Sequence, residues 1–255
     1  MNFLEKREFP LSMLASDTMV LLHLLRGQRG KLGEDSHAQN LERFYAPQAS
    51  RYDDFRDRLL HGREELLERL APAPGSTVIE LGGGTGRNLE FLGARMLSLD
   101  RVDVVDICPA LLSQASERCA RWPEVAHAVQ ADAATYDPGR LADCVYFSYS
   151  LTMMPDWRAT LANALRMLRP GGLLGVVDFY VSDRELPSGF AHHNALERWF
   201  WQHWFAHDGV HLSEKHLPAL AQCTEPIHVG EHMGSIPWLP GLRAPYFLYV
   251  GRKLR

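Results

Sequence analysis

The sequence predicts an α/β protein with a mostly parallel sheet covered by helices on both faces, and two observations carry this prediction. From Thr77 onward, apolar runs of strand length alternate with helical runs. The first of these runs leads directly into a glycine-rich loop, Gly82 to Gly86, that opens a helix. The chain has 255 residues, 46% of them hydrophobic and 23% charged. This size and composition suit one soluble globular domain with an attached segment.

The expected elements alternate along the chain and give seven strands. The strands are expected at 77–81, 102–105, 126–130, 144–148, 173–179, 227–229 and 246–250. Helices are expected between them at 87–97, 109–121 and 157–168. The run Arg169-Pro170-Gly171-Gly172 ends the last of these helices, because Pro cannot continue a helix and Gly favours a turn.

Residues 1–74 predict a helical cap or lid. Apolar side chains recur at helical spacing from Leu11 to Leu25, and further helices are expected at 40–45 and 52–70. The turn Ala71-Pro72-Ala73-Pro74-Gly75 ends this region. The α/β domain is therefore expected at 75–255, with a helical insertion at about 186–217 that is rich in His and aromatic residues.

Charge and cysteine usage restrict the partners and the compartment. The formal net charge is −4, so there is no basic excess to neutralise phosphates and no nucleic-acid partner is expected. The four cysteines form no C-x-x-C pair and predict reduced thiols in a cytoplasmic protein. The first ten residues do not fit a secretory signal. The stretch 11–25 is too polar and short to span a bilayer, although it suits peripheral contact with the inner face of a membrane.

The glycine loop and an acidic residue downstream predict a nucleoside site. Glycines let the main chain turn sharply and approach a ligand, although a simple tight turn gives the same signal. Asp106 ends the second expected strand, where its carboxylate would accept hydrogen bonds from both ribose hydroxyls. The alternative for Asp106 is a cap on the following helix.

The glycine spacing favours S-adenosylmethionine (SAM) over a dinucleotide. Glu80 precedes Gly82, Gly84 and Gly86 in an E-x-G-x-G-x-G arrangement, which differs from the G-x-G-x-x-G of pyrophosphate binders. A carboxylate at Glu80 would repel a pyrophosphate but would help to hold the cationic methionine end of SAM, directly or through water. Asp132-Ala133 follows the third strand, where a carboxylate can accept from the adenine amine or simply cap the loop. The residues expected to bind SAM are Tyr52, Glu80, Gly82, Gly84, Thr85, Asn88, Asp106, Ile107, Asp132, Ala133 and Ser148.

These motifs, with Met167-Leu168-Arg169-Pro170-Gly171-Gly172 before the fifth strand, resemble the class I SAM-dependent methyltransferase superfamily. The resemblance covers Thr77 to Phe179, with the motifs in the expected order. It implies a Rossmann-like class I methyltransferase fold and S-adenosylhomocysteine as the product of the cofactor.

Longer strings show a sharper resemblance. They include the runs 52–56, 60–63, 80–88, 146–157, 177–182, 192–195, 199–201, 205–210 and 246–251. From Tyr45 onward, this set is similar to the bacterial betaine-lipid N-methyltransferases and to the matching half of the eukaryotic betaine-lipid synthases. The resemblance implies three successive methylations of the amine of diacylglyceryl-homoserine, giving diacylglyceryl-trimethylhomoserine.

Candidates for the transfer step lie after the fourth and fifth strands. Tyr149 would hydrogen-bond the amine or face the growing cation with its ring, and core packing is the alternative. His192 or His193 would take a proton between methylations, and a polar contact at a helix start is the alternative. Asp178 would balance ammonium charge or cap a strand end, and Arg56 or Arg63 would meet an acceptor carboxylate or form surface ion pairs.

His203, His207 and His211 recur every four residues, but Asp208-Gly209 predicts a helix stop. We therefore expect no metal site and favour hydrogen bonding for these three residues. The competing functions are a methyltransferase of a small soluble amine and a SAM-binding protein without methyl transfer. The acceptor is a lipid or a small amine, and a homo-oligomer or a complex with the acceptor-synthesising enzyme remains open.

Overall fold

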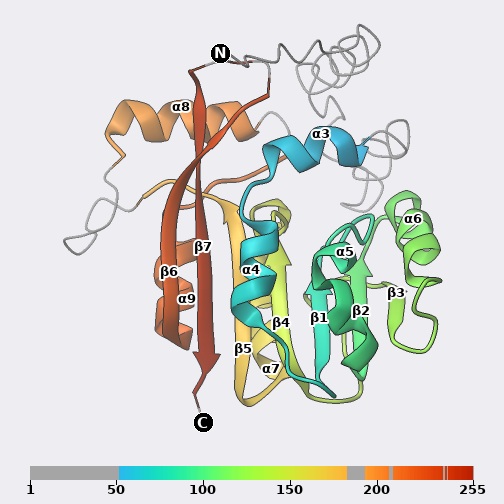
Figure 1. Cartoon of the computed structure of the whole chain (residues 1–255). Helices are drawn as coiled ribbons and strands as arrows, with labels where there is room; N and C mark the ends of the chain where they lie inside the picture. The colour runs from blue at the N-terminus through green and yellow to red at the C-terminus, as the bar shows by residue number, and fades with distance from the viewer. Residues whose placement is uncertain (1–51, 183–192, 207–208, 238, 240, 255) are drawn as a thin grey trace, which may run out of the picture.

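The computed structural model describes residues 52–182, 193–206, 209–237, 239 and 241–254, with only the main chain of 52–55. Their centre is a seven-stranded sheet in the order β3-β2-β1-β4-β5-β7-β6 (Figure 1). β7 pairs antiparallel with both β5 and β6, while the other neighbours pair in parallel. This confirms the mostly parallel sheet. The strands are β1 (Thr77–Leu81), β2 (Arg101–Asp106), β3 (Ala126–Gln130), β4 (Ala142–Ser148), β5 (Leu168–Phe179), β6 (Thr224–Ser235) and β7 (Arg243–Lys253).

Helices cover both faces of the sheet. One face carries α4 (Arg63–Leu70), α5 (Leu89–Leu92) and α6 (Pro109–Cys119), and the other carries α7 (Trp157–Met167) and α9 (His216–Cys223) (Figure 1). Side chains that alternate along a strand enter different cores, because successive Cβ atoms point to opposite faces. Val78 and Val104 join the core under α4, α5 and α6, whereas Ile79 and Val105 join the core under α7 and α9.

Some elements differ from the sequence prediction. The helix expected at 87–97 shrinks to the four residues of α5, followed by a 3₁₀ helix at Gly93–Ser98, because Gly93 takes a positive φ of 53°. β5 starts at Leu168 rather than at 173, with an irregular register against β4 between Ala142 and Cys144. β6 and β7 are each much longer than expected, because they pair with one another along their whole length.

The α4 helix belongs to the core of the α/β domain. Leu66, Leu67 and Leu70 are fully buried against the sheet. Gly175 on β5 gives Leu70 room, since a Cβ there would lie 2.8 Å from Leu70 Cδ1. The predicted cap at 1–74 therefore includes at least one helix, α4, that packs directly on a face of the sheet. Its boundary at 74 stays a prediction, because residues 1–51 lie outside the described part of the chain.

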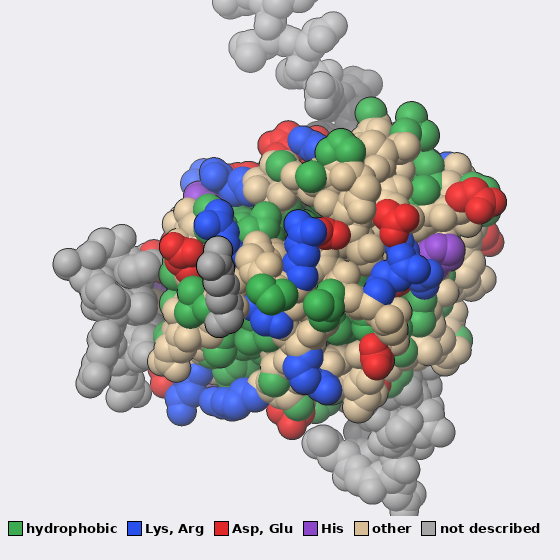
Figure 2. Space-filling model, turned by 90° about the horizontal axis from the view of Figure 1, so that it is seen from below, with side chains coloured by type: hydrophobic (Ala, Val, Ile, Leu, Met, Phe, Trp, Pro, Cys, Tyr) green, Lys and Arg blue, Asp and Glu red, His purple; other side chains and the backbone are tan. Residues whose placement is uncertain are grey.

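Two further helices lie beyond the carboxyl ends of the parallel strands, α3 (Tyr52–Leu59) and α8 (Ala195–Ala206) (Figure 1). The opposite end of the molecule mixes Lys and Arg side chains with acidic and apolar ones (Figure 2). Among the helices that the structure describes, none has the length and apolar character to cross a bilayer. The fold thus directs attention to the edge under α3, where the parallel strands end.

Candidate functional site

A cavity of about 250 Å³ lies at the carboxyl ends of β1, β2 and β4. In open α/β sheets this edge is the usual ligand site, because the loops that follow the strands converge there. The wall is formed by the loops after β1, β2, β3 and β4, and by Arg56 from α3. Of the residues predicted to bind the cofactor, the cavity wall contains Gly82, Gly84, Asp106, Ile107, Asp132 and Ala133.

The glycine loop owes its shape to alternate glycines in the left-handed region. Gly82, Gly84 and Gly86 have φ of 71°, 55° and 69°. A Cβ on Gly82 would lie 2.5 Å from the Cβ of Ser150, so only glycine fits there. A Cβ on Gly84 would meet only Leu111, at 3.8 Å, and would otherwise project into open space on the cavity side. The missing side chain at Gly84 therefore leaves room for a ligand to approach the main chain.

Asp106 lies at the end of β2 with its carboxylate held from two sides. The Gly84 N–H donates to one oxygen at 2.8 Å and the Cys108 N–H donates to the other at 2.9 Å. Burial raises the pKa of Asp106, and these N–H groups oppose that effect. The two carboxylate oxygens carry four lone pairs between them, so capacity remains for a further donor after the main-chain N–H groups are counted. This geometry suits a vicinal diol such as the ribose of a nucleoside.

The far end of the cavity offers an apolar slot with one carboxylate. Asp132 accepts from the Ala134 N–H at 2.8 Å through one oxygen, which fixes the loop after β3. Ile107 and Leu111 supply apolar surface to the same cavity. A flat base between these apolar groups could donate its amine to the second oxygen of Asp132. Cofactor contacts of these residues stay a prediction, but their arrangement fits adenosine.

Tyr149 closes the cavity on the side of β4 and has an unusual main chain. Its φ is 54°, a conformation that is strained for a bulky residue. Its hydroxyl donates to the His61 carbonyl at 2.7 Å, and its ring packs on Phe179 with centroids 4.6 Å apart. Because the hydroxyl is bonded within the protein, the ring and main chain are what Tyr149 presents to a ligand.

Comparison with known proteins agrees with this geometry. The family model described as a methyltransferase domain matches residues 52–225. The chain belongs to the methyltransferase domain family. Its fold is the class I fold, and SAM is the methyl donor of this class. The predicted cofactor, enzyme class and fold are thereby confirmed, and the predicted family is confirmed at the level of SAM-dependent methyltransferases.

Relatives of this methyltransferase have several acceptors in their names. It is 34% identical to trans-aconitate 2-methyltransferase of Methylobacterium radiotolerans over 125 residues, which are 49% of this chain and 46% of that protein. It is 31% identical to a ubiquinone/menaquinone biosynthesis C-methyltransferase of an Enterobacter species over 140 residues, which are 51% of this chain and 55% of that protein. The chain thus spans about half the length of the curated relatives it matches.

Solved structures share the fold at low identity. The N-methyltransferase NodS of Bradyrhizobium japonicum, in complex with S-adenosyl-L-homocysteine, aligns with a TM-score of 0.62 and 21% identity. That alignment covers 87% of this chain and 100% of the NodS chain. A phosphoethanolamine N-methyltransferase of Haemonchus contortus, in complex with SAM, aligns with a TM-score of 0.64 and 14% identity, over 88% of this chain and 61% of that one. These likenesses show the fold alone.

In the methyltransferase, Glu80 lies beneath the glycine loop rather than in the described cavity wall. It is 1% exposed and accepts from Asn88 Nδ2 at 2.6 Å and from the Tyr146 hydroxyl at 2.9 Å. Burial raises the pKa of Glu80 to about 7, although both hydrogen bonds work against this. Asn88 Oδ1 is buried with no partner among the described residues, so it is available to a ligand donor or a water. Support of the methionine end of SAM by Glu80 and Asn88 stays a prediction.

Other predicted cofactor residues lie behind the wall. Thr85 is buried, and its carbonyl accepts from Arg118 Nη1 at 2.5 Å. Ser148 ends β4 with a buried hydroxyl that has no partner among the described residues. Tyr52 is the first residue of α3, but its side chain lies outside the described part, as does all of His192. Direct contact of Thr85, Ser148 and Tyr52 with SAM stays a prediction, and so does the role of His192 as a proton acceptor.

His193 is held away from the described cavity. Its Nδ1 accepts from the Ser182 N–H at 3.0 Å, and its ring packs beside Tyr180. With Nδ1 as acceptor, Nε2 carries the proton of the neutral ring, and burial lowers the pKa of His193. This tautomer leaves no lone pair for a substrate proton, so the geometry favours a positioning role for His193 over general base catalysis.

Asp178 acts as the strand-end cap. It accepts from Thr152 through both the main-chain N–H, at 3.1 Å, and the hydroxyl, at 2.8 Å. Burial raises the pKa of Asp178 to about 7 despite these bonds. Of the three spaced histidines, His203 lies on α8 (Ala195–Ala206) and His211 lies outside this helix, so these two do not share a helix face, and His207 lies outside the described residues. Among the described residues no group of His, Cys, Asp and Glu has the arrangement of a metal site.

Sequence reasoning missed part of the wall. Ser150, Met153, Met154 and Thr160 line the cavity beside Tyr149. They come from the turn after β4 and the first turn of α7, where neither a glycine pattern nor a charged residue at a strand end marks them. Ser150 is recognised only from the structure, where its hydroxyl donates to the Leu81 carbonyl at the entry to the glycine loop.

Proposed function

We propose that this domain transfers methyl groups from SAM to the nitrogen of an amine held in the cavity beside Tyr149. The observation that carries the proposal is one continuous cavity with Gly84, Asp106 and Asp132 on one side and Tyr149 on the other. Three carboxylates line this cavity, those of Asp106, Asp132 and Asp156, against one basic side chain, Arg56. An acidic, partly aromatic wall favours an acceptor that is an amine before transfer and a cation after it.

The chain's contribution to such a reaction is positioning. The amine lone pair attacks the methyl carbon, the bond from that carbon to sulfur breaks toward sulfur, and S-adenosylhomocysteine and an N-methylated ammonium ion result, which carries a proton to lose after the first two transfers but not after the third. Asp106 would fix the nucleoside, and the wall from Tyr149 to Met154 would hold the amine in line. Ordered approach of two bound reactants can account for much of the acceleration of such a transfer. Of the described predicted residues, His193 is not arranged as a base, so water is the simplest receiver of the amine proton.

For the acceptor itself, we propose the head group of diacylglyceryl-homoserine, methylated three times. The long strings from 52 to 251 that resemble betaine-lipid N-methyltransferases support this choice. Leu196 and Trp199 are 71% and 55% exposed on α8, at the carboxyl edge of the sheet, and suit contact with acyl chains or an interface. The second candidate is a small soluble amine. The relatives support its small size, because their names specify small-molecule acceptors such as trans-aconitate, although trans-aconitate is not itself an amine.

Methyl transfer from labelled SAM distinguishes the lipid acceptor from the small soluble amine. Purified protein is incubated with diacylglyceryl-homoserine in detergent micelles, with free homoserine, and with phosphoethanolamine, and the products are resolved by mass. Stepwise gain of one, two and three methyl groups on the lipid alone supports the lipid acceptor. Transfer to a soluble amine alone rejects the lipid acceptor and keeps N-methylation. No transfer to any of them, with SAM bound, supports a protein that binds SAM without using these amines.

A further inference from the structure

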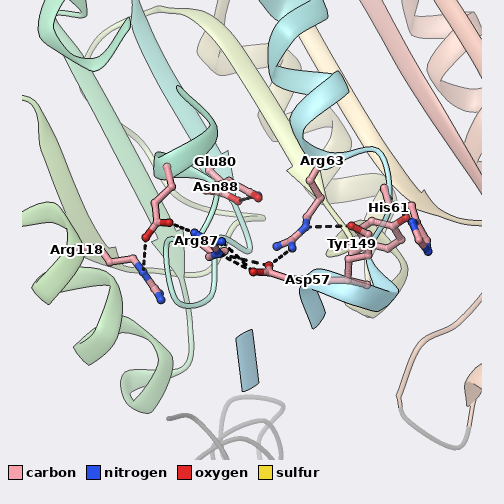
Figure 3. Close-up of polar contacts among 10 residues, drawn as sticks. Asp57, His61, Arg63, Glu80, Arg87, Asn88, Arg118 and Tyr149 are labelled. Carbon is pink, nitrogen blue, oxygen red and sulfur yellow. Dashed lines mark hydrogen bonds and ion pairs between the residues drawn. The ribbon is translucent and has the colours of Figure 1, made fainter. Parts of the chain in front are cut away.

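A carboxylate of the α3 helix connects it to the arginine that follows the cofactor loop. Asp57 lies between two guanidinium groups, those of Arg63 and Arg87 (Figure 3). Arg87 donates to Asp57 through Nε at 3.0 Å and approaches it through Nη2 at 2.9 Å. Arg63 donates to the other oxygen of the same carboxylate through Nη2. Partial burial alone would raise the pKa of Asp57, but the two arginines outweigh it and hold that pKa below its usual value.

Both arginines belong to the rigid part of the domain. Arg63 begins α4 and is 7% exposed, and its Nε donates to the Leu60 carbonyl at 3.2 Å. Arg87 directly follows Gly86, the last glycine of the cofactor loop. The two guanidinium groups also lie over the same Phe91 ring, 5.4 Å and 5.5 Å from its centroid. Asp57 therefore connects α3 to a fixed surface rather than to another mobile side chain.

The same network supports the glycine loop from its other side. Arg87 pairs with Glu90, and Glu90 pairs with Arg121 at 2.9 Å and with Arg118 at 3.6 Å. Arg118 donates in turn to the Thr85 carbonyl, inside the loop. A change at Asp57 thus reaches the loop through Arg87, and a change in the loop reaches α3 by the same route.

The residue beside Asp57 explains why this attachment matters for the site. Arg56 lines the cofactor cavity, and its positive charge acts on Asp106 by lowering that residue's pKa, against the larger effect of burial. We call α3 seated when Asp57 is bonded to both Arg63 and Arg87. Because Arg56 and Asp57 are consecutive on one short helix, the seated helix places Arg56 at the cavity. Ligands that contact the cavity wall then favour the seated helix, and by linkage a seated helix favours those ligands.

We propose that Asp57 is a positioning residue that couples the seating of α3 to cofactor binding. This rests on the proposed function only in taking SAM as the ligand of the cavity, and it is independent of the acceptor. In Asp57→Asn the helix is seated a smaller fraction of the time, and the apparent affinity for SAM falls by that fraction. We expect a dissociation constant for S-adenosylhomocysteine roughly tenfold higher than in the wild type, from a seated fraction of about one tenth.

Calorimetry and hydrogen exchange together test this proposal. Calorimetry gives the dissociation constant of S-adenosylhomocysteine for the wild type, Asp57→Asn and Glu68→Gln, the last being a matched loss of one charge at an exposed position of α4. Exchange of the main-chain amides of 52–59 is followed with and without the ligand. We expect weaker binding only in Asp57→Asn, fast exchange of α3 in its free form, and slower exchange of α3 once the ligand saturates the protein. The strands β1 to β5 should stay protected in every variant.

Several outcomes would overturn the coupling. Unchanged affinity in Asp57→Asn, or equal weakening in Glu68→Gln, would remove it. Loss of protection across β1 to β5 would make Asp57 a general stabilising residue instead. In a double-mutant cycle with Arg87→Gln, additive effects on affinity would also reject it, because the two side chains would then act separately. A wild type that fails to bind S-adenosylhomocysteine would reject the proposed cofactor site itself, which is a different result from any of these.

Discussion

The two sides of the cavity are built in different ways. On the cofactor side, after β1 to β3, the shape comes from the main chain: alternate glycines with positive φ and carboxylates bonded to N–H groups. On the acceptor side, after β4, the shape comes from side chains fixed by distant partners, such as Tyr149 on His61 and Ser150 on Leu81. The first kind of site depends on local sequence, and the second depends on how the whole chain packs.

The largest effect that would test this contrast is expected for Asp106→Ala. The substitution removes the two oxygens that would accept from the ribose and releases the Gly84 N–H from its acceptor. Hydrogen bonds to a charged group contribute roughly 1.5–3 kcal/mol each, so the loss of two should weaken binding of S-adenosylhomocysteine about a hundredfold or more. Calorimetry measures this change. Asp100→Ala, an exposed aspartate paired with Arg140, serves as the control and should bind normally. Unchanged affinity in Asp106→Ala would refute the ribose site.

Gly84→Ala should have the next largest effect, and Gly93→Ala is its matched control. Both glycines have a positive φ, 55° and 53°, so a Cβ is strained at each position, by about 1–3 kcal/mol. Only the Cβ at Gly84 would enter the cavity wall, while that at Gly93 meets nothing within 4 Å. We expect both variants to lose thermal stability, but only Gly84→Ala to bind the cofactor more weakly, by at least about tenfold. Equal affinities would mean that the ligand does not approach the main chain at Gly84.

The contrast also explains what the sequence could predict. The alternation of strands and helices, the glycine loop and the place of Asp106 at a strand end follow from spacing along neighbouring residues, and they were predicted from it. The short α5 and the long β6–β7 pair were not, because a glycine in the middle of a helical run decides the first and pairing between residues 8 to 29 positions apart decides the second. Tyr149 was found by its place at a strand end. That its hydroxyl bonds to His61, 88 residues earlier, required the packed fold.

On the acceptor side, Tyr149→Phe and Tyr149→Leu separate the hydroxyl from the ring. Removing the hydroxyl leaves the His61 carbonyl without this donor and should lower the free energy of unfolding by about 1 kcal/mol. Because the ring remains, methyl transfer by Tyr149→Phe should stay near the wild-type rate. The leucine variant loses the ring as well, and its kcat/KM for the amine should fall by roughly tenfold if the ring faces the developing cation. A large fall of kcat in Tyr149→Phe with unchanged stability would make the hydroxyl itself catalytic.

The smallest effect concerns pH and the buried Glu80 beneath the cofactor loop. Its pKa rises from 4.5 to about 7 on folding, mainly through burial. Between these values the folded protein keeps a proton that the unfolded chain releases, so this residue lowers stability progressively as the pH rises from 4.5 to 7. Asp178 likewise lowers stability as the pH rises, because burial raises its pKa to about 7. His216, whose pKa burial lowers to about 4, has the opposite effect and raises stability as the pH rises. Because these effects overlap, the pH profile of the wild type alone cannot identify Glu80.

The Glu80→Gln variant isolates the contribution of Glu80 to the pH dependence of stability. Glutamine keeps the shape and an acceptor for Asn88 but does not ionise, so its stability lacks the Glu80 contribution to the pH dependence. Urea unfolding at pH 5, 6, 7 and 8 gives the difference in unfolding free energy between the wild type and the variant. We expect this difference to move against the wild type as the pH rises to about 7 and to level off above it. A difference that is the same at every pH would mean that Glu80 is ionised throughout. Asn88 would then hold a permanent carboxylate beneath the cofactor loop, and Glu80 would contribute a full negative charge toward the cationic end of SAM.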